Sequence, residues 1–282
     1  MAIRMTEPLD AEGFPSLSSW ESAPPLRFDA DWQGKNADRE RNTEVRLLWT
    51  LESLFLRFRA RYRVITVFAD AEASGRRDQL WDRDVAEVFL QPDPSQLRRY
   101  LEFEVSPNGF WVDLEIAPGQ KHDLKSGLRR RVILNKAAKT WVAELALPMK
   151  SLVERFDPAA KWKVNFYRVE GAEESRFYSA WQPTRTPEPN FHVPEAFGEL
   201  VFAEVIWDFN TGAGIVGSGW LFDTNTFDGE NQSGPEPIDQ NNGWGHYYTT
   251  GISPVTVTWQ TMYAGLNTGN WSSVAVAFKP AP

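Results

Sequence analysis

Alternation of apolar and charged side chains is the feature that most constrains the fold of this chain. From Leu54 to Tyr62 every second residue is apolar, and from Arg57 to Arg63 every second residue is arginine. Successive side chains of a β-strand point to opposite faces, so this pattern predicts a strand with one apolar face and one basic face. A helix would instead bring apolar side chains together at intervals of three and four residues.

Segments of similar length follow one another through the first 205 residues. The links between them contain Pro, Gly, Asn and Asp, which favour tight turns between antiparallel neighbours. One stretch, MKSLVERF (149–156), has the composition of a short helix. We therefore predict an antiparallel β-sandwich of about ten strands and one short helix. The predicted strands are 43–50, 53–62, 85–91, 99–106, 109–117, 130–135, 140–148, 161–171, 176–184 and 197–205.

The composition changes near residue 205. Residues 206–282 hold 11 of the 19 glycines and carry one basic residue against six acidic ones. We predict two segments, a β-sandwich over 1–205 and a Gly/Asn/Trp-rich segment over 206–282; one domain with a long C-terminal extension is the alternative. The second segment ends in a predicted β-hairpin (254–262 and 271–280). A hairpin is marginal alone, so this one has to dock on the sandwich, pair with another chain or stay partly disordered.

Charge and composition exclude several functional classes. The chain has 30 Lys and Arg against 38 Asp and Glu, a net charge of −8, so it lacks the basic field that attracts nucleic acid. It contains no cysteine, which removes disulfides, thiolate metal sites and thiol nucleophiles. We expect no signal peptide on this chain and no membrane span, because no apolar run reaches the roughly 18–20 residues of a spanning helix.

Charged side chains lie on the polar faces of the predicted strands. Glu87, Glu102, Glu104 and Glu144 belong to three strands, and the arginine row belongs to a fourth. Opposite charges that face each other across strands would stabilise a solvated sheet face by roughly 0.2–1 kcal/mol per pair. The alternative is a polar concave floor, in which arginine donors and glutamate acceptors read the hydroxyl groups of a ligand.

Tryptophan is abundant, with 13 residues in the chain. Trp49, Trp141 and Trp162 lie in apolar alternation, so we predict that they pack in the core. Trp81 and Trp181 lie instead at strand ends among polar neighbours. An indole face is electronegative and attracts the polarised C–H groups of a sugar ring, which makes these two rings candidate stacking platforms.

Six motifs follow one another in an order that is typical of one family. They are LWDRDVAEVFL, RYLEFEVSPNGFWVDLEI, TWVAELALP, KWKVNFYRVEG, SAWQPT and PNFHVPEAFGELVF. Over about residues 17–205 they resemble carbohydrate-binding module family 9, within the DOMON-like superfamily. The resemblance implies a β-sandwich that binds sugars, in particular chain ends of plant polysaccharides such as xylan, and that often accompanies a xylanase. It also implies a bacterial, extracellular or periplasmic setting and a role in carbohydrate catabolism.

The resemblance further implies which residues hold the sugar. In the family the ligand lies between two tryptophans, with charged and amide side chains at its hydroxyl groups. Trp81 and Glu87 match the first tryptophan and its carboxylate, and Trp181 is the best match to the second ring. Asn165 and Arg168 are the candidate polar partners.

Calcium is the cofactor that the family resemblance allows. Members of the family often bind this ion, which prefers oxygen ligands. Asp82, Asp84 and Asp93 are the candidate ligands in this chain.

Three other functions compete with sugar binding. The first is a glycoside hydrolase or a protein that assists one. A hydrolase needs two carboxylates about 5–5.5 or 6.5–9.5 Å apart; among 38 acidic residues some pair meets this by chance, and Glu102 with Glu104 on one strand face is as good a candidate as any. Some DOMON-like domains bind haem through Met and His, for which Met149 and His192 are the candidates. The third alternative is a surface attachment or interaction module in which residues 206–282 make the contacts. We predict non-catalytic binding of an oligosaccharide or polysaccharide, with no catalytic residues.

Overall fold

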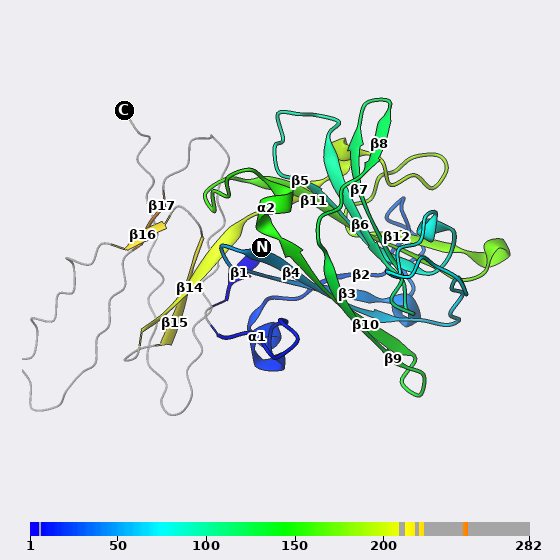
Figure 1. Cartoon of the computed structure of the whole chain (residues 1–282), viewed down its shortest axis with the longest axis horizontal. Coiled ribbons are helices and arrows are strands. Elements are labelled where there is room, and N and C mark those ends of the chain that lie inside the picture. Colours follow the sequence, from blue (N-terminus) through cyan, green and yellow to red (C-terminus); the bar gives the residue numbers. More distant parts are fainter. Residues whose placement is uncertain (6, 209–211, 218–219, 223–244, 248–282) are drawn as a thin grey trace, which may run out of the picture.

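A computed structural model shows that the chain forms a β-sandwich (Figure 1). The structure describes residues 1–5, 7–208, 212–217, 220–222 and 245–247. The described strands are β1 (Ala2–Arg4), β2 (Leu26–Phe28), β3 (Thr43–Trp49), β4 (Ser53–Arg61), β5 (Val85–Gln91), β6 (Tyr100–Val105), β7 (Trp111–Ala117), β8 (Gln120–Asp123), β9 (Arg129–Asn135), β10 (Thr140–Pro148), β11 (Trp162–Glu170), β12 (Phe177–Ala180), β13 (Gly198–Leu200), β14 (Phe202–Asp208), β15 (Gly212–Gly217), β16 (Trp220–Phe222) and β17 (Gly245–Tyr247). The described helices are α1 (Leu17–Ser22), α2 (Met149–Leu152) and the 3-10 turns η1 (Arg39–Arg41), η2 (Leu80–Asp82), η3 (Glu173–Ser175) and η4 (Pro194–Ala196).

Two large sheets face each other. Sheet A has the order β15-β14-β1-β3-β4-β10-β9, with β2 paired to β3, and sheet B has the order β12-β11-β5-β6-β7-β8, with β13 paired to β11. The described strands pair antiparallel, as predicted, except that β1 runs parallel to both β3 and β14. A parallel neighbour needs a long crossover, and the chain between β1 and β3 supplies one through α1 and β2. The sandwich prediction is therefore confirmed, with one parallel strand added.

Alternation decides which side chains fill the space between the sheets. The predicted apolar face of β4 lies in this inter-sheet core, where Leu54, Leu56, Phe58 and Ala60 are fully buried. The three tryptophans predicted for the core are also in it and are at most 2% exposed. Each large buried apolar side chain contributes roughly 1.5–3 kcal/mol relative to an exposed one. The core of the sandwich was thus predictable from period two alone.

The arginines of β4 lie on the opposite face of sheet A, where Arg57 forms an ion pair. Arg57 stands across from Glu144 in the register of β4 and β10, with Arg57 Nε 3.2 Å from Glu144 Oε1. Arg131 of β9 reaches the other oxygen of the same carboxylate at 2.5 Å. The other glutamates considered for a mixed floor, those of β5 and β6, belong to sheet B. A single floor of arginines and glutamates is therefore not formed.

The predicted strand over 197–205 is divided between the two sheets. β13 pairs with β11 in sheet B, and β14 pairs with β1 and β15 in sheet A. Leu200 and Phe202, the residues on either side of the crossing, are 1% and 0% exposed and both lie in the inter-sheet core. β14 continues past residue 205, so the expected segment boundary falls inside a strand.

Several short elements differ from the sequence predictions. The helix predicted over 149–156 covers only Met149–Leu152, and α1, β1, β2 and β8 were not predicted because elements of three to six residues carry too little periodicity. No helix in the described part of the chain is long and apolar enough to cross a membrane. The hairpin predicted over 254–262 and 271–280 lies outside the described residues.

Replacing Gly198 by Ala should destabilise the sandwich. A Cβ atom at this position would lie 2.6 Å from Cη2 and Cζ3 of Trp181, so the ring has to shift. We expect a loss of about 1–3 kcal/mol, as for overpacking elsewhere, measured by chemical denaturation. In a Trp181→Leu background the same substitution should cost much less. An equal loss in both backgrounds would show that the ring contact is not the cause.

Candidate functional site

Three glutamates lie side by side on the face of sheet B that points away from sheet A. The antiparallel register of β5 and β6 puts Glu87 directly opposite Glu104. Glu102 is two residues from Glu104 along β6 and therefore shares its face. Neighbouring positions of the same strands, Val88 and Phe103, point the other way into the inter-sheet core. We call Glu87, Glu102 and Glu104 the acidic cluster.

The acidic cluster is buried and poorly satisfied. Its side chains are 2%, 2% and 0% exposed in sequence order. Four carboxylate oxygens have no hydrogen-bond partner among the described residues: Glu87 Oε1, Glu102 Oε2 and both oxygens of Glu104. Burial raises the pKa of Glu87 and of Glu104 well above the ordinary value, and neighbouring carboxylates raise each further. Because a buried carboxylate without donors is costly, the cluster favours protons, cations or donor groups of a ligand.

An aromatic ring and a lysine lie beside the acidic cluster. Trp81, from η2, packs against the apolar side chains on this outer face of sheet B. Lys121 of β8 places its Nζ 3.8 Å from the centre of the Trp81 ring. The positive charge of Lys121 also lowers the pKa of Glu87 and of Glu104, opposing the effect of burial. Lys121 carries no signal in the sequence, because β8 is a short strand without an apolar pattern.

A second ring, that of His192, lies at the same face. Its Nδ1 is 2.6 Å from the hydroxyl of Tyr100 and 4.0 Å from Glu102 Oε2. Its ring centre is 5.4 Å from that of Phe89, and its side chain is 51% exposed. Desolvation lowers the pKa of His192, although the charge of Glu102 acts in the other direction. In the sequence His192 was named only as a candidate haem ligand. Its place in the motif PNFHVPEAFGELVF was the signal that could have pointed to a role in sugar binding.

Asn165 lies on the outer face of β11, but its amide is fully engaged. The Nδ2 group donates to the Tyr167 hydroxyl at 2.7 Å and to the Gln182 carbonyl at 2.9 Å. The Oδ1 atom accepts from the Gln182 N–H at 3.0 Å. Asn165 is fully buried. It therefore holds the segment after β12 in place rather than offering free polar atoms.

Arg168 lies on the other side of sheet B. It is 1% exposed, its Nη1 donates to the Arg61 carbonyl at 2.6 Å, and its guanidinium carbon is 5.7 Å from the centre of the Trp141 ring. Its Nη2 is 3.6 Å from Glu170 Oε2. Arg168 is three residues from Asn165 on the same strand, and an odd spacing places the two side chains on opposite faces of the sheet. The predicted role of Arg168 at a sugar's hydroxyl groups does not fit this position.

Trp181 and Trp81 pack on opposite faces of sheet B. The backbone N–H of Trp181 donates to the backbone carbonyl of Phe166 at 2.9 Å, and the ring centres of Trp181 and Phe166 are 5.8 Å apart. Phe166 belongs to the inter-sheet core, and Trp181 packs against that core. Ala180 still faces outward, so alternation turns the next side chain inward. The structure does not bring the two predicted platforms together around one space.

The three candidate calcium ligands are also not assembled. Asp84 is buried and accepts hydrogen bonds from the backbone N–H groups of Thr66 and Gly171. Asp93 accepts from the backbone and hydroxyl of Ser95. Asp84 precedes and Asp93 follows the seven-residue β5, which puts them roughly 20 Å apart along the strand. Asp82 adjoins Asp84, and within the described ranges no group of His, Asp and Glu side chains could hold a metal ion.

The candidate haem pair is separated as well. Met149 is 2% exposed and belongs to the inter-sheet core. His192 lies beside the acidic cluster on the outer face of sheet B. Two axial ligands of one haem have to face each other across the iron, so this pair does not fit a haem site.

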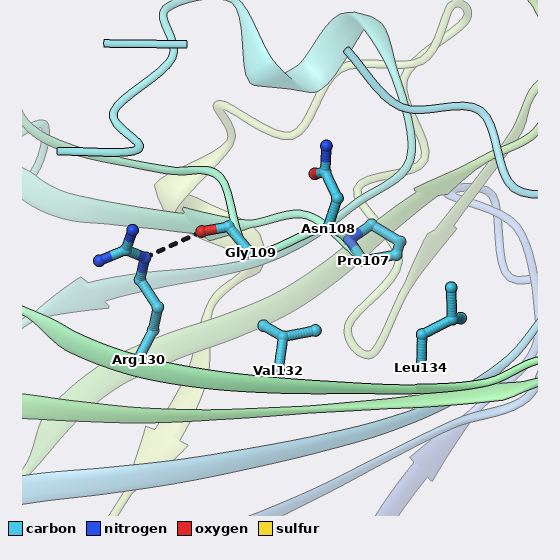
Figure 2. Close-up of a pocket in the computed structure, with 6 residues that line it drawn as sticks. All are labelled: Pro107, Asn108, Gly109, Arg130, Val132 and Leu134. Carbon is cyan, nitrogen blue, oxygen red and sulfur yellow. Dashed lines mark hydrogen bonds between the residues drawn. The ribbon is translucent and has the colours of Figure 1, made fainter. Parts of the chain in front are cut away.

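A pocket of about 430 Å³ lies elsewhere, between the turn after β6 and strand β9 (Figure 2). Val132 and Leu134 supply apolar side chains from β9, and Asn108 lies across from them. Arg130 Nε donates to the Gly109 carbonyl at 2.9 Å, as Figure 2 shows. Its Nη2 donates to the Ser74 carbonyl at 2.8 Å, so the charged group of this pocket is already engaged. The outer face of sheet B offers the stronger recognition chemistry.

Residues 41–202 match the model of carbohydrate-binding family 9. This range contains Trp81, His192 and the acidic cluster. The chain belongs to carbohydrate-binding family 9, as the motifs predicted.

Two curated proteins have related sequences. An extracellular protein of Arthroderma benhamiae is 23% identical over 177 residues, which are 57% of this chain and 78% of that protein. The UPF0462 protein C4orf33 homolog of Rattus norvegicus is 26% identical over 130 residues, which are 44% of this chain and 61% of that protein.

Solved structures share the fold. A proposed carbohydrate-binding protein of Bacteroides uniformis aligns with a TM-score of 0.58 and 18% identity, over 71% of this chain and 97% of its own. A family 9 module of Caldicellulosiruptor kristjanssonii in complex with glucose aligns with a TM-score of 0.52 and 15% identity, over 74% of this chain and 97% of its own.

Replacing Glu104 by Gln should make the protein more stable at alkaline pH. The folded state raises the pKa of Glu104, so its contribution to stability is fully present below the ordinary carboxyl pKa and is lost as pH rises through the folded-state value. We expect the variant to gain about 1–3 kcal/mol at alkaline pH, and little in acid. Thermal or urea unfolding across the pH range measures this difference. The exposed Glu154→Gln variant is the control, and identical pH slopes for all three proteins would contradict the assignment.

Proposed function

We propose that this protein binds an oligosaccharide or polysaccharide, without hydrolysing it, on the outer face of sheet B. The observation that carries the proposal is the Trp81 ring placed beside the buried acidic cluster in a family 9 sandwich. Glu87 stays in the proposed site, as expected from its spacing to Trp81. We propose His192, rather than Trp181, as the second ring of the site, because His192 lies beside Glu102 on the outer face of sheet B.

Ring and carboxylates supply the two kinds of contact that a sugar needs. The C–H groups of a pyranose pack on an indole face, which is electronegative. The hydroxyl groups of the sugar donate hydrogen bonds, and the carboxylate oxygens left without partners in the acidic cluster accept them. Tyr100 and His192 form a hydrogen-bonded pair next to Glu102 and offer a further acceptor or donor.

The arrangement of the carboxylates supports binding rather than hydrolysis. A glycosidase places its two carboxyl groups on either side of the scissile bond. Glu87, Glu102 and Glu104 instead come from two adjacent strands and form one floor. The three carboxyl groups therefore lie on one side of any ligand that binds to the outer face of sheet B.

The related proteins agree with this proposal. The Caldicellulosiruptor kristjanssonii module binds glucose, and its fold is shared by this chain. The fungal relative is described as extracellular, where polysaccharides are met, and we propose the same setting for this protein.

Replacing Trp81 by Ala should weaken sugar binding. Loss of stacking on one ring costs roughly 1–3 kcal/mol where aromatic side chains bind flat rings. Titration calorimetry with cello- and xylo-oligosaccharides, combined with an assay for released reducing ends, measures affinity and hydrolysis together. We expect binding by the native protein, weaker binding by Trp81→Ala and no reducing ends from either.

Trp181→Phe decides between the two tryptophans. Because Trp181 packs against the inter-sheet core, this variant should lose stability but keep its sugar affinity within about twofold, well below the tenfold that 1.4 kcal/mol represents. If Trp181→Phe loses affinity and Trp81→Ala does not, the binding face has been assigned wrongly.

A further inference from the structure

Burial and mutual repulsion disfavour negative charge in the acidic cluster and raise the pKa of Glu87 and of Glu104, so a cation beside the cluster would be favourable. Three carboxylates are buried on one sheet face, and Lys121 is the cation whose charge opposes that of Glu87 and Glu104. His192 Nδ1 lies 4.0 Å from Glu102 Oε2, and desolvation lowers the pKa of this imidazole, which opposes a positive charge on it. A neutral sugar can satisfy carboxylate oxygens with its hydroxyl groups, but it brings no charge of its own.

Lys121 shows what kind of group fits beside this cluster. Its ammonium lies 3.8 Å from the centre of the Trp81 ring, close enough to the carboxylates to influence two of them. A cation over an indole face is attracted by the ring's negative face, and an ammonium offers three N–H donors. The Trp81 ring beside the acidic cluster therefore already holds an ammonium.

The ammonium of Lys121 is also free to move away from the Trp81 ring. β8 is the edge strand of sheet B, and all four of its residues are exposed. The stem of a lysine has four rotatable carbons, so its ammonium can swing into water without a change in the sheet. A ligand with an ammonium of its own can then occupy the same position.

We infer that the preferred ligand is an amino sugar, a glucosamine-type unit whose ammonium replaces that of Lys121 over the Trp81 ring, beside the acidic cluster. This inference rests on the proposed function, because it specifies which sugar the outer face of sheet B selects. Two sets of contacts carry it: the unpartnered oxygens of three carboxylates that are at least 98% buried, and the cation already seated on the ring. The described residues form no metal-binding group here, which favours an organic cation over a metal ion.

A matched pair of tetrasaccharides tests the inference on the native protein. Cellotetraose and the fully deacetylated chitosan tetramer have the same β-1,4-linked backbone and differ at C2, which carries a hydroxyl or an ammonium. Hydrogen bonds to charged groups are stronger than neutral ones by about 1 kcal/mol or more, so we expect the amino tetramer to bind about tenfold more tightly at pH 6.5. The N-acetylated tetramer, which has no charge, should lose this advantage.

Two pairs of variants locate the effect. Glu87→Gln should abolish most of the preference for the amino tetramer, whereas Glu154→Gln, which removes the same charge from an exposed position, should retain it. Lys121→Ala should raise affinity for the amino tetramer severalfold by removing the competing ammonium. Lys136→Ala, at an exposed turn of sheet A, should leave it unchanged.

The outcomes separate this inference from the proposed function. Tighter binding of the amino tetramer that depends on Glu87 supports the inference. Equal or tighter binding of cellotetraose by the native protein overturns it and leaves carbohydrate binding standing, as does an equal loss of preference in Glu87→Gln and Glu154→Gln. Failure of native protein to bind any of the three tetramers, or the xylo-oligosaccharides above, overturns both.

Discussion

Close packing of the two sheets is the constraint on which the rest of the structure depends. Strands β5, β6 and β11 contribute every second side chain to the inter-sheet core, where Val88, Phe103 and Phe166 are at most 1% exposed. A strand anchored in this way has no freedom to slip by one residue, because slipping would exchange its apolar and polar faces. The positions that remain, including Glu87 and Glu104, are thereby held on the outer face of sheet B.

The acidic cluster destabilises the folded protein but supplies unsatisfied carboxyl groups for ligand binding. Buried carboxylates that lack donors oppose folding, and Glu87 faces another carboxylate across the strands rather than a cation. On the outer face of sheet A, by contrast, the carboxylate of Glu144 forms ion pairs with Arg57 and Arg131. An unsatisfied polar group in an otherwise well-packed protein is expected at sites of function. This contrast between two faces of one sandwich supports a ligand site on sheet B.

Prediction from sequence succeeded where a side chain's role depends on its own strand. The core positions of Trp49, Trp141 and Trp162 followed from alternation. The positions of two other residues did not follow in this way: Arg168 shares a motif with Asn165 but lies on the other face of β11, and the Trp181 ring turns inward beside Phe166. Motif matching treats such residues as neighbours, whereas the pleat of the strand separates them. Lys121 and His192 come from a short strand and a loop, for which no periodicity exists.

Period two, the turn residues and the ordered motifs determined a β-sandwich of carbohydrate-binding family 9, with Trp81 and Glu87 as candidate ligand contacts. Those properties depend on local backbone geometry and on patterns within single segments. Tertiary structure alone decided which residues share a face: Glu87 with Glu104, Trp81 with Lys121, and His192 with Glu102. These pairs join segments separated by 17 to 90 residues, so their contacts arise from strand register and loop packing, which no local pattern encodes.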